Sequence, residues 1–122
     1  MITIQLTQRQ AFDAITIFLE KYYNATQSNQ IHFLLSDMDM QTWGSGNEPA
    51  DPALWEDWID CINGKENLTI EEAYHALSLF VGMRYALEPD KHIVALVDMI
   101  QNTKDPYLWQ LWLEAVKYIQ EQ

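Results

Sequence analysis

The sequence predicts an all-α protein, a compact bundle of about six helices built from two duplicated three-helix units. Three observations predict this fold. Apolar residues recur at helical spacing along two long segments. Three blocks of sequence recur in the same order in both halves of the chain. No stretch alternates convincingly between apolar and polar residues, as a half-buried strand would. Because the chain has 122 residues, of which 48% are apolar, we expect one domain spanning 1–122.

The first repeated block is a long amphipathic helix. The segments "LTQRQAFDAITIFLEKYY" and "LTIEEAYHALSLFVGMRY" align at an offset of 62 residues, and each places its apolar residues on one face. Both segments open with a capping box, formed by Thr7 with Gln10 and by Thr69 with Glu72. In this motif the hydroxyl accepts from a free backbone N–H and the later side chain reaches back. We therefore expect helices across 8–23 and 70–85.

The second and third blocks follow in the same order. "FLLSDM" and "VALVDM" are 61 residues apart, and "DPALWEDWIDCI" and "DPYLWQLWLEAV" are 54 residues apart. Asp51 and Asp105 are expected to cap the last pair of helices, each with a proline in the first turn, where a missing N–H is tolerated. The repeated units are therefore 6–62 and 68–119, and we expect Trp55 and Trp109 to be largely buried where the units pack.

The chain carries few residues that suggest enzyme chemistry. Glu72 and His75 form a Glu-x-x-His pair, but the matching residues Gln10 and Asp13 break the pattern that a dinuclear metal bundle needs. Cys61 is the only cysteine, so no internal disulfide is possible and a packed thiol in a reducing cytoplasm is expected. We therefore expect no catalytic residue, no cofactor and no metal. A helical-bundle metalloenzyme is the less favoured alternative.

Charge indicates the kind of partner. The net charge of −11 would repel nucleic acid and an acidic membrane surface, and it would attract a basic protein. No run of 18 apolar residues occurs and the N-terminus lacks the pattern of a signal peptide, so we expect a cytoplasmic protein without a membrane segment. The stretch from Tyr22 to Gly64 contains seven acids and no Lys or Arg, whereas the second unit has seven acids and four bases.

The acidic stretch coincides with the main difference between the units. The first unit has seven extra residues between its second and third helices, in "DMDMQTWGSGNEPA", and this loop carries Trp43 outside the repeated pair. Tryptophan is enriched at binding hot spots. Because Asp51 is explained by its capping role, we expect the other acids to meet a partner, with Asp57 and Asp60 exposed. The candidate partner-binding residues are Asp37, Asp39, Trp43, Glu48, Glu56, Asp57 and Asp60.

The first sixty residues resemble the CdiI-type immunity proteins of contact-dependent growth inhibition systems. The resemblance is carried by the helix beginning "LTQRQAFDA", by "LLSDM", by a glycine-containing loop and by "DPALWEDW". The loop reads "GSGNEPADPA" where the family more commonly has "DGGT-x-DPA". These families are small, soluble, cytoplasmic bacterial proteins. The resemblance implies that the chain neutralises one cognate toxin domain, often a basic nuclease.

Composition and resemblance together lead to a functional expectation. The chain would bind a basic toxin domain, with an RNase favoured, in a 1:1 complex, and would occlude its active-site cleft with an acidic surface. The alternative is an acidic nucleic-acid mimic that inhibits a DNA-binding protein. A mimic would need acids at phosphate-like intervals over a long face, whereas these acids concentrate in one segment.

Overall fold

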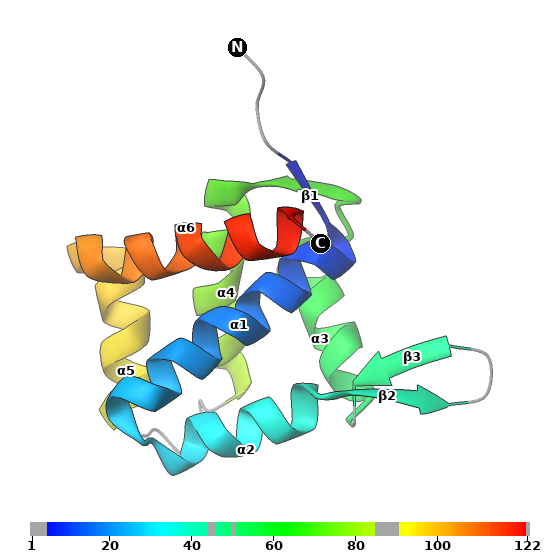
Figure 1. Ribbon diagram of the computed structural model, residues 1–122, viewed down its shortest axis with the longest axis horizontal. Helices are drawn as coiled ribbons and strands as arrows, with labels where there is room; N and C mark the ends of the chain where they lie inside the picture. The colour runs from blue at the N-terminus through cyan, green and yellow to red at the C-terminus, as the bar shows by residue number, and fades with distance from the viewer. Residues whose placement is uncertain (1–4, 44–45, 50, 85–90, 122) are drawn as a thin grey trace.

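The computed structural model describes residues 5–43, 46–49, 51–84 and 91–121, with the backbone alone described for 40–43, 46–48 and 84. Six α-helices lie in these residues: α1 (Gln8–Thr26), α2 (Asn29–Met38), α3 (Ala53–Cys61), α4 (Ile70–Arg84), α5 (Lys91–Asp98) and α6 (Pro106–Gln120). A π-helical segment, η1 (Met99–Thr103), continues α5. The strands are β1 (Gln5–Thr7), β2 (Met40–Trp43), β3 (Gly46–Pro49) and β4 (Asn67–Thr69). The predicted all-α bundle of about six helices is confirmed (Figure 1).

The two long helices begin with the capping boxes that the sequence predicts. At the start of α1, the Thr7 hydroxyl accepts from the Gln10 N–H at 3.1 Å, and the Gln10 side chain accepts from the Thr7 N–H at 3.0 Å. At the start of α4, the corresponding distances between Thr69 and Glu72 are 3.1 and 2.9 Å. Each box satisfies two backbone donors that a helix otherwise leaves unpaired.

The residues before these boxes join the two halves of the chain. Strands β1 and β4 pair antiparallel with Leu6 opposite Leu68, and both side chains are buried. These two residues occupy the same position in the two aligned segments. A two-fold rotation exchanges the two strands of an antiparallel pair. The axis of this rotation passes between Leu6 and Leu68. The strands were not predicted, because three residues are too few to display a period of two.

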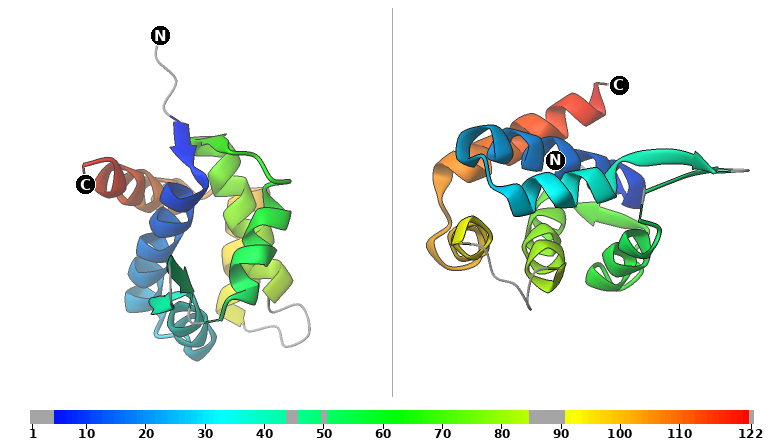
Figure 2. Two further views of the ribbon diagram at one scale, coloured as in Figure 1. Left: turned by 90° about the vertical axis from the view of Figure 1, so that its right-hand side faces the viewer. Right: turned by 90° about the horizontal axis from the view of Figure 1, so that it is seen from below.

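The helices form two layers (Figure 2). One layer contains α1, α2 and α6, and the other contains α4, α5 and α3. The third helix of each half packs against the first helix of the other half, since α6 contacts α1 and α3 contacts α4. Each layer therefore combines segments from both halves of the chain.

Two buried tryptophans hold the third helices in place. The Trp58 indole Nε1–H donates to the Gln8 carbonyl at 3.2 Å, and the Trp112 indole Nε1–H donates to the Ile70 carbonyl at 3.1 Å. Donors and acceptors occupy matching positions in the two aligned halves, and both tryptophan side chains are fully buried. Each bond satisfies an N–H that would be costly to bury without an acceptor.

Eight aromatic rings surround these bonds in two matching sets of four. Phe12 meets Trp55 with ring centroids 5.5 Å apart, and the matching pair of Tyr74 and Trp109 is 5.0 Å apart. Across the halves, Trp58 meets Phe80 at 5.9 Å, and Phe18 meets Trp112 at 6.2 Å. Each of these four pairs meets edge to face, the arrangement that aromatic quadrupoles favour. The origin of the units 6–62 and 68–119 by duplication stays a prediction.

Two expectations about the third helices need correction. Trp55 and Trp109, expected to be largely buried, are only partly buried, whereas Trp58 and Trp112 are fully buried. Residues three apart on a helix point about 60° apart, so only one of each pair can face the centre of the core. Asp105 caps α6 as predicted, but α3 begins at Ala53 and the Asp51 carboxylate accepts from the Ala53 N–H.

The difference between the paired tryptophans predicts unequal stability losses. Trp112→Ala should lower the free energy of unfolding by about 3–5 kcal/mol, because it removes a fully buried ring and leaves the Ile70 carbonyl without its donor. Trp109→Ala should cost clearly less. Denaturant unfolding would measure both values, and equal losses would contradict the assigned burial.

One ring position differs in polarity between the halves. Tyr74 stands where the first half has Phe12, and its hydroxyl is buried without a hydrogen-bond partner in the part of the chain that the structure describes. Burial, with a smaller contribution from Asp105, raises the pKa of Tyr74 to about 12. The side chain therefore stays a neutral phenol whose hydroxyl is desolvated and unsatisfied.

Tyr74→Phe should stabilise the protein by about 1 kcal/mol, since an unsatisfied buried hydroxyl costs about 1–3 kcal/mol. Tyr22→Phe is the matched control, because the Tyr22 hydroxyl donates to the His92 carbonyl at 2.7 Å. The control substitution should therefore destabilise the protein. Thermal and denaturant unfolding of both variants would test this, and a loss of stability in Tyr74→Phe would refute it.

Candidate partner-binding surface

Helix α3 presents acidic side chains at three positions. Glu56 and Asp60 are exposed and lie four residues apart, which places them on one face of the helix. Asp57 is half-buried, so the expectation that it would be exposed like Asp60 is only partly met. It follows Glu56 by one residue and is therefore turned about 100° toward the body of the protein. Glu56 and Asp60 are the better candidates for direct contact with a partner.

The acids of α3 affect the pKa of the single cysteine, Cys61. The pKa of the Cys61 thiol is raised to about 11, chiefly by burial and then by the carboxylates of Asp57 and Asp60. Both carboxylates therefore lie close enough to Cys61 for their negative charge to disfavour the thiolate. The half-buried thiol packs against the core, as the sequence predicts for a structural cysteine, and its raised pKa disfavours the reactive thiolate.

The end of α2 carries the next pair of candidate residues. Asp37 is half-buried in the last turn of the helix and Asp39 is exposed just after it. The Asp37 carbonyl accepts from the Asp51 N–H at 3.0 Å, which ties the end of α2 to the segment that leads into α3. The C-terminal end of a helix carries partial negative charge, so α2 adds to the negative potential at this place.

The extra residues of the first half form a β-hairpin rather than the loop that we expected. Strands β2 and β3 pair antiparallel, with Met40 opposite Pro49 and Gln41 opposite Glu48. The hairpin projects from the helical body between the end of α2 and the start of α3 (Figure 1). Trp43 and Glu48 belong to its strands, and the positions of their side chains lie outside the described residues. The candidate residues therefore lie at the end of α2, on the hairpin of β2 and β3, and on α3, which follow one another along the chain.

A pocket that the sequence did not predict lies beside the root of the hairpin. Its volume is about 420 Å³. It is lined by α1, by the end of α2 and by one residue of α6: Gln10, Asp13, Thr16, Ile17, Met38, Asp39 and Ile119. Sequence reasoning missed it because Asp13 and Thr16 read as ordinary polar positions on the outer face of α1. Only packing between distant segments reveals the pocket.

A second pocket, of about 470 Å³, lies between the start of α4 and the start of α6. Its walls include the rings of Tyr74 and Trp109, and its charged lining mixes Glu71 and Asp105 with Lys104. Because charges of both signs line it, this pocket has no clear preference for a cationic or an anionic ligand.

The described residues offer no site for a metal ion, since no group of three or more His, Cys, Asp and Glu side chains is suitably placed among them. Glu72 of the Glu-x-x-His pair is engaged in the capping box and in an ion pair with Lys65. The hydrogen bond from Lys65 is the largest of the contacts that lower the pKa of Glu72. Its carboxylate therefore has a structural role at the start of α4.

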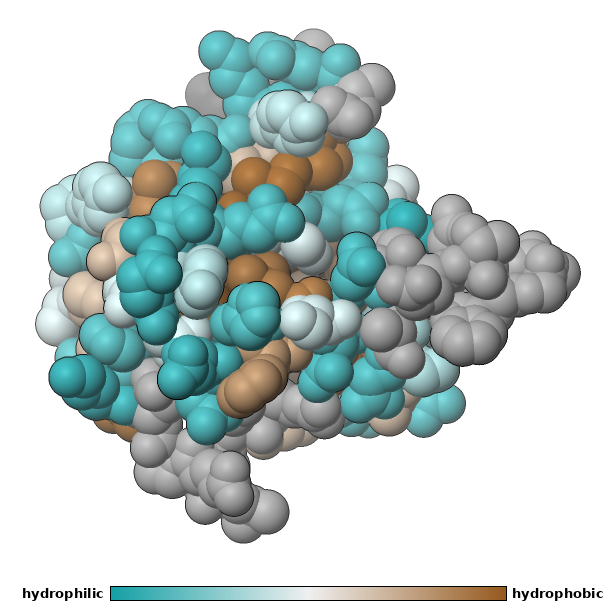
Figure 3. All heavy atoms as spheres, turned by 60° about the horizontal axis from the view of Figure 1, so that its bottom comes forward, coloured by the Kyte–Doolittle hydropathy of each residue, from teal (hydrophilic) through white to brown (hydrophobic). Residues whose placement is uncertain are grey.

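One face of the molecule shows how exposed hydrophobic residues are distributed on it. On the face shown in Figure 3, hydrophobic residues appear in small patches separated by hydrophilic ones. In the described segments, no helix combines the length and apolar character needed to cross a membrane.

Comparison of the chain with protein-family models, with curated proteins and with solved structures found no match. The surface chemistry of the first half is therefore the main guide to function.

The raised pKa of Cys61 predicts slow alkylation that depends on the acids of α3. At pH 8 the thiolate fraction should be about a hundredfold below that of an unperturbed cysteine thiol. Asp57→Asn should increase the rate of reaction with iodoacetamide, whereas Glu114→Gln on α6 should leave the rate unchanged. The rate would be followed by mass spectrometry. Equal rates for Asp57→Asn and the unaltered protein would show that this carboxylate does not face the thiol.

Proposed function

We propose that this chain is an immunity protein that binds one cognate toxin domain and neutralises it by occluding a basic active-site cleft. The observation that carries the proposal is the distribution of charge. The stretch from Tyr22 to Gly64 has seven acids and no Lys or Arg, and its acids lie at the end of α2, in the hairpin, just before α3 and on α3. These elements are consecutive and lie at one end of the molecule.

The physical basis of the proposal is an electrostatic imbalance within the protein. Acids in this stretch have no base from the same segment to neutralise them, so they repel one another and weaken the folded state. A basic cleft would remove that repulsion on binding. A nuclease cleft is basic because it must hold phosphates, and carboxylates at the same places would exclude the nucleic-acid substrate.

The resemblance to the CdiI-type immunity proteins is the second support. Several residues that carry it have structural roles here, since Met38 and Trp58 are buried and Asp51 accepts from the Ala53 N–H. Others, such as Glu56, are exposed on α3. The resembling segment therefore combines residues that maintain the fold with acids that are available to a partner. A cytoplasmic location and a 1:1 complex belong to the same proposal.

The proposal predicts a position-specific effect of charge reversal. The toxin domain to test is the one encoded by the neighbouring reading frame, expressed in cells that carry variants of this chain. Asp60→Lys should abolish protection, because a basic cleft would face a like charge. Glu114→Lys is the matched control, since Glu114 is exposed at the corresponding position of α6 and the change in net charge is the same.

The free energy of unfolding of each variant should lie within about 0.5 kcal/mol of the value for the unaltered protein, because both sites are exposed. Denaturant unfolding would measure these values. Survival of cells carrying Asp60→Lys, or equal loss of protection with Glu114→Lys, would show that α3 is not the interface.

Association should also depend strongly on salt. If the acidic stretch steers the partner, the association rate should fall steeply as ionic strength rises, while the dissociation rate should change less. Stopped-flow measurement of binding to the purified toxin domain at several salt concentrations would determine both rates. An association rate that is independent of salt would mean that the charge serves solubility only.

A further inference from the structure

We infer that the pocket beside the hairpin root is an anchor site for a basic side chain, arginine or lysine, of the bound partner. The inference rests on the proposed function only for the identity of the protein that supplies this side chain. The pocket lies next to the candidate surface, because Asp39 belongs to both. Its volume of about 420 Å³ leaves room for one long side chain.

The lining of the pocket matches the two parts of such a side chain. Ile17, Met38 and Ile119 supply apolar walls against which an aliphatic stem can pack. Asp13 and Asp39 supply carboxylates for the charged head, and no lysine or arginine is among the lining residues. Thr16 also lines the pocket, and its hydroxyl donates to the Phe12 carbonyl at 3.1 Å.

The helices around the pocket add to its preference for a cation. Met38 and Asp39 lie at the C-terminal end of α2, and Ile119 lies in the last turn of α6. The C-terminal ends of helices carry partial negative charge, so both helices favour a positive group nearby. The whole chain has a net charge of −11, which attracts the same kind of ligand over a longer range.

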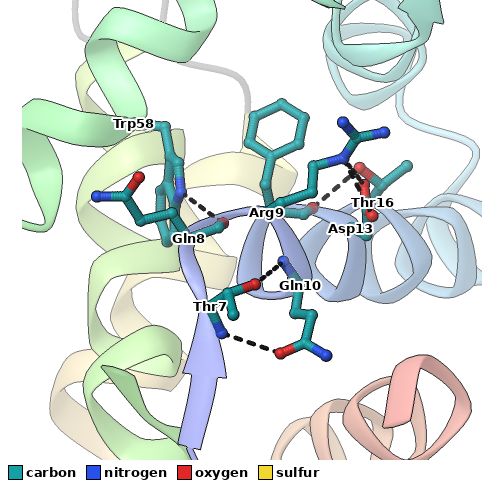
Figure 4. A network of polar contacts seen from close by, with 8 residues as sticks. Thr7, Gln8, Arg9, Gln10, Asp13, Thr16 and Trp58 are labelled. Carbon is teal, nitrogen blue, oxygen red and sulfur yellow. Dashed lines mark hydrogen bonds and ion pairs between the residues drawn. The ribbon is translucent and has the colours of Figure 1, made fainter. Parts of the chain in front are cut away.

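One internal cation already pairs with an acid of the pocket, although it does not line the pocket itself. The Arg9 guanidinium Nε donates to both oxygens of Asp13, at 3.1 and 3.2 Å, as Figure 4 shows. Arg9 reaches Asp13 from the preceding turn of α1, and its side chain is 44% exposed. An exposed pair of this kind contributes little to stability, so an incoming guanidinium can compete for the carboxylate. Arg9 is therefore a competitor whose removal should strengthen binding.

The experiment uses N-acetyl-arginine amide as the probe and N-acetyl-citrulline amide as its neutral isostere. Each compound is titrated into the ¹⁵N-labelled full chain, and backbone amide shifts are followed. The arginine probe should shift the amides of Thr16, Ile17 and Asp39, and the citrulline probe should not. Citrulline shifting the same amides equally, or no shift with arginine at millimolar concentrations, would overturn the inference.

Matched variants distinguish binding of the probe in the pocket from its attraction by the overall negative charge of the protein. Asp13→Asn should weaken binding of the arginine probe about tenfold, as expected for the loss of a charge-assisted hydrogen bond. Glu20→Gln makes the same change in charge on an exposed position of α1 and should have little effect. Arg9→Gln should tighten binding, whereas Lys21→Gln should not. Equal effects of the pocket variants and their controls would leave no role for the pocket.

Binding to the toxin domain distinguishes this inference from the proposed function. If Asp60→Lys abolishes protection and Asp13→Asn leaves affinity for the toxin domain unchanged, the pocket is not an anchor and the proposed function stands. If the arginine probe binds with the predicted variant pattern but the toxin domain does not bind at all, the cation site stands and the proposed function is wrong.

Discussion

The fold depends on the hydrogen bond that a buried tryptophan of each third helix makes to the start of the first helix in its own half. Trp58 and Trp112 are buried in the same way, and each uses its only side-chain hydrogen-bond donor on a carbonyl at the start of a long helix. Those carbonyls belong to the residues that directly follow Thr7 and Thr69, within the capping boxes that fix where the long helices begin. The edge-to-face contacts with Phe80 and Phe18 then connect the two halves. One repeated interaction thus positions α3 and α6 on opposite layers.

This shared core leaves the outer positions of the third helices free to differ. Where α3 has exposed acids at Glu56 and Asp60, α6 has Gln110 and Glu114. The larger difference is the hairpin, which only the first half inserts between its second and third helices. Because the Asp51 N–H bonds to the Asp37 carbonyl, the insertion leaves and returns at nearly the same point. The core can therefore accommodate the hairpin insertion at this end without a change in its packing.

The sequence predicted the parts of the structure that depend on local chemistry. Capping boxes and the proline after Asp105 act within one turn, so the starts of α1, α4 and α6 were predicted well, whereas α3 begins later than its expected cap at Asp51 implied. Strands β1 and β4 were missed because three residues show no periodicity, and the hairpin was missed because a glycine-rich stretch reads as a loop. Which tryptophan of each pair is buried depends on how α3 and α6 are rotated against distant helices. The pocket with Asp13 depends on packing of α1, α2 and α6, which no local pattern encodes.

The central claim is that the acidic first-half surface meets a basic partner. The test is hydrogen–deuterium exchange of the chain, alone and with the proposed toxin partner. Exchange should slow on binding in the end of α2, in β2 and β3, and in α3. Backbone amides of α5, η1 and α6 up to Trp112 should exchange as in the free chain. Slowing confined to α5, η1 and the start of α6 would contradict the account, because the partner would then occupy the opposite end of the fold.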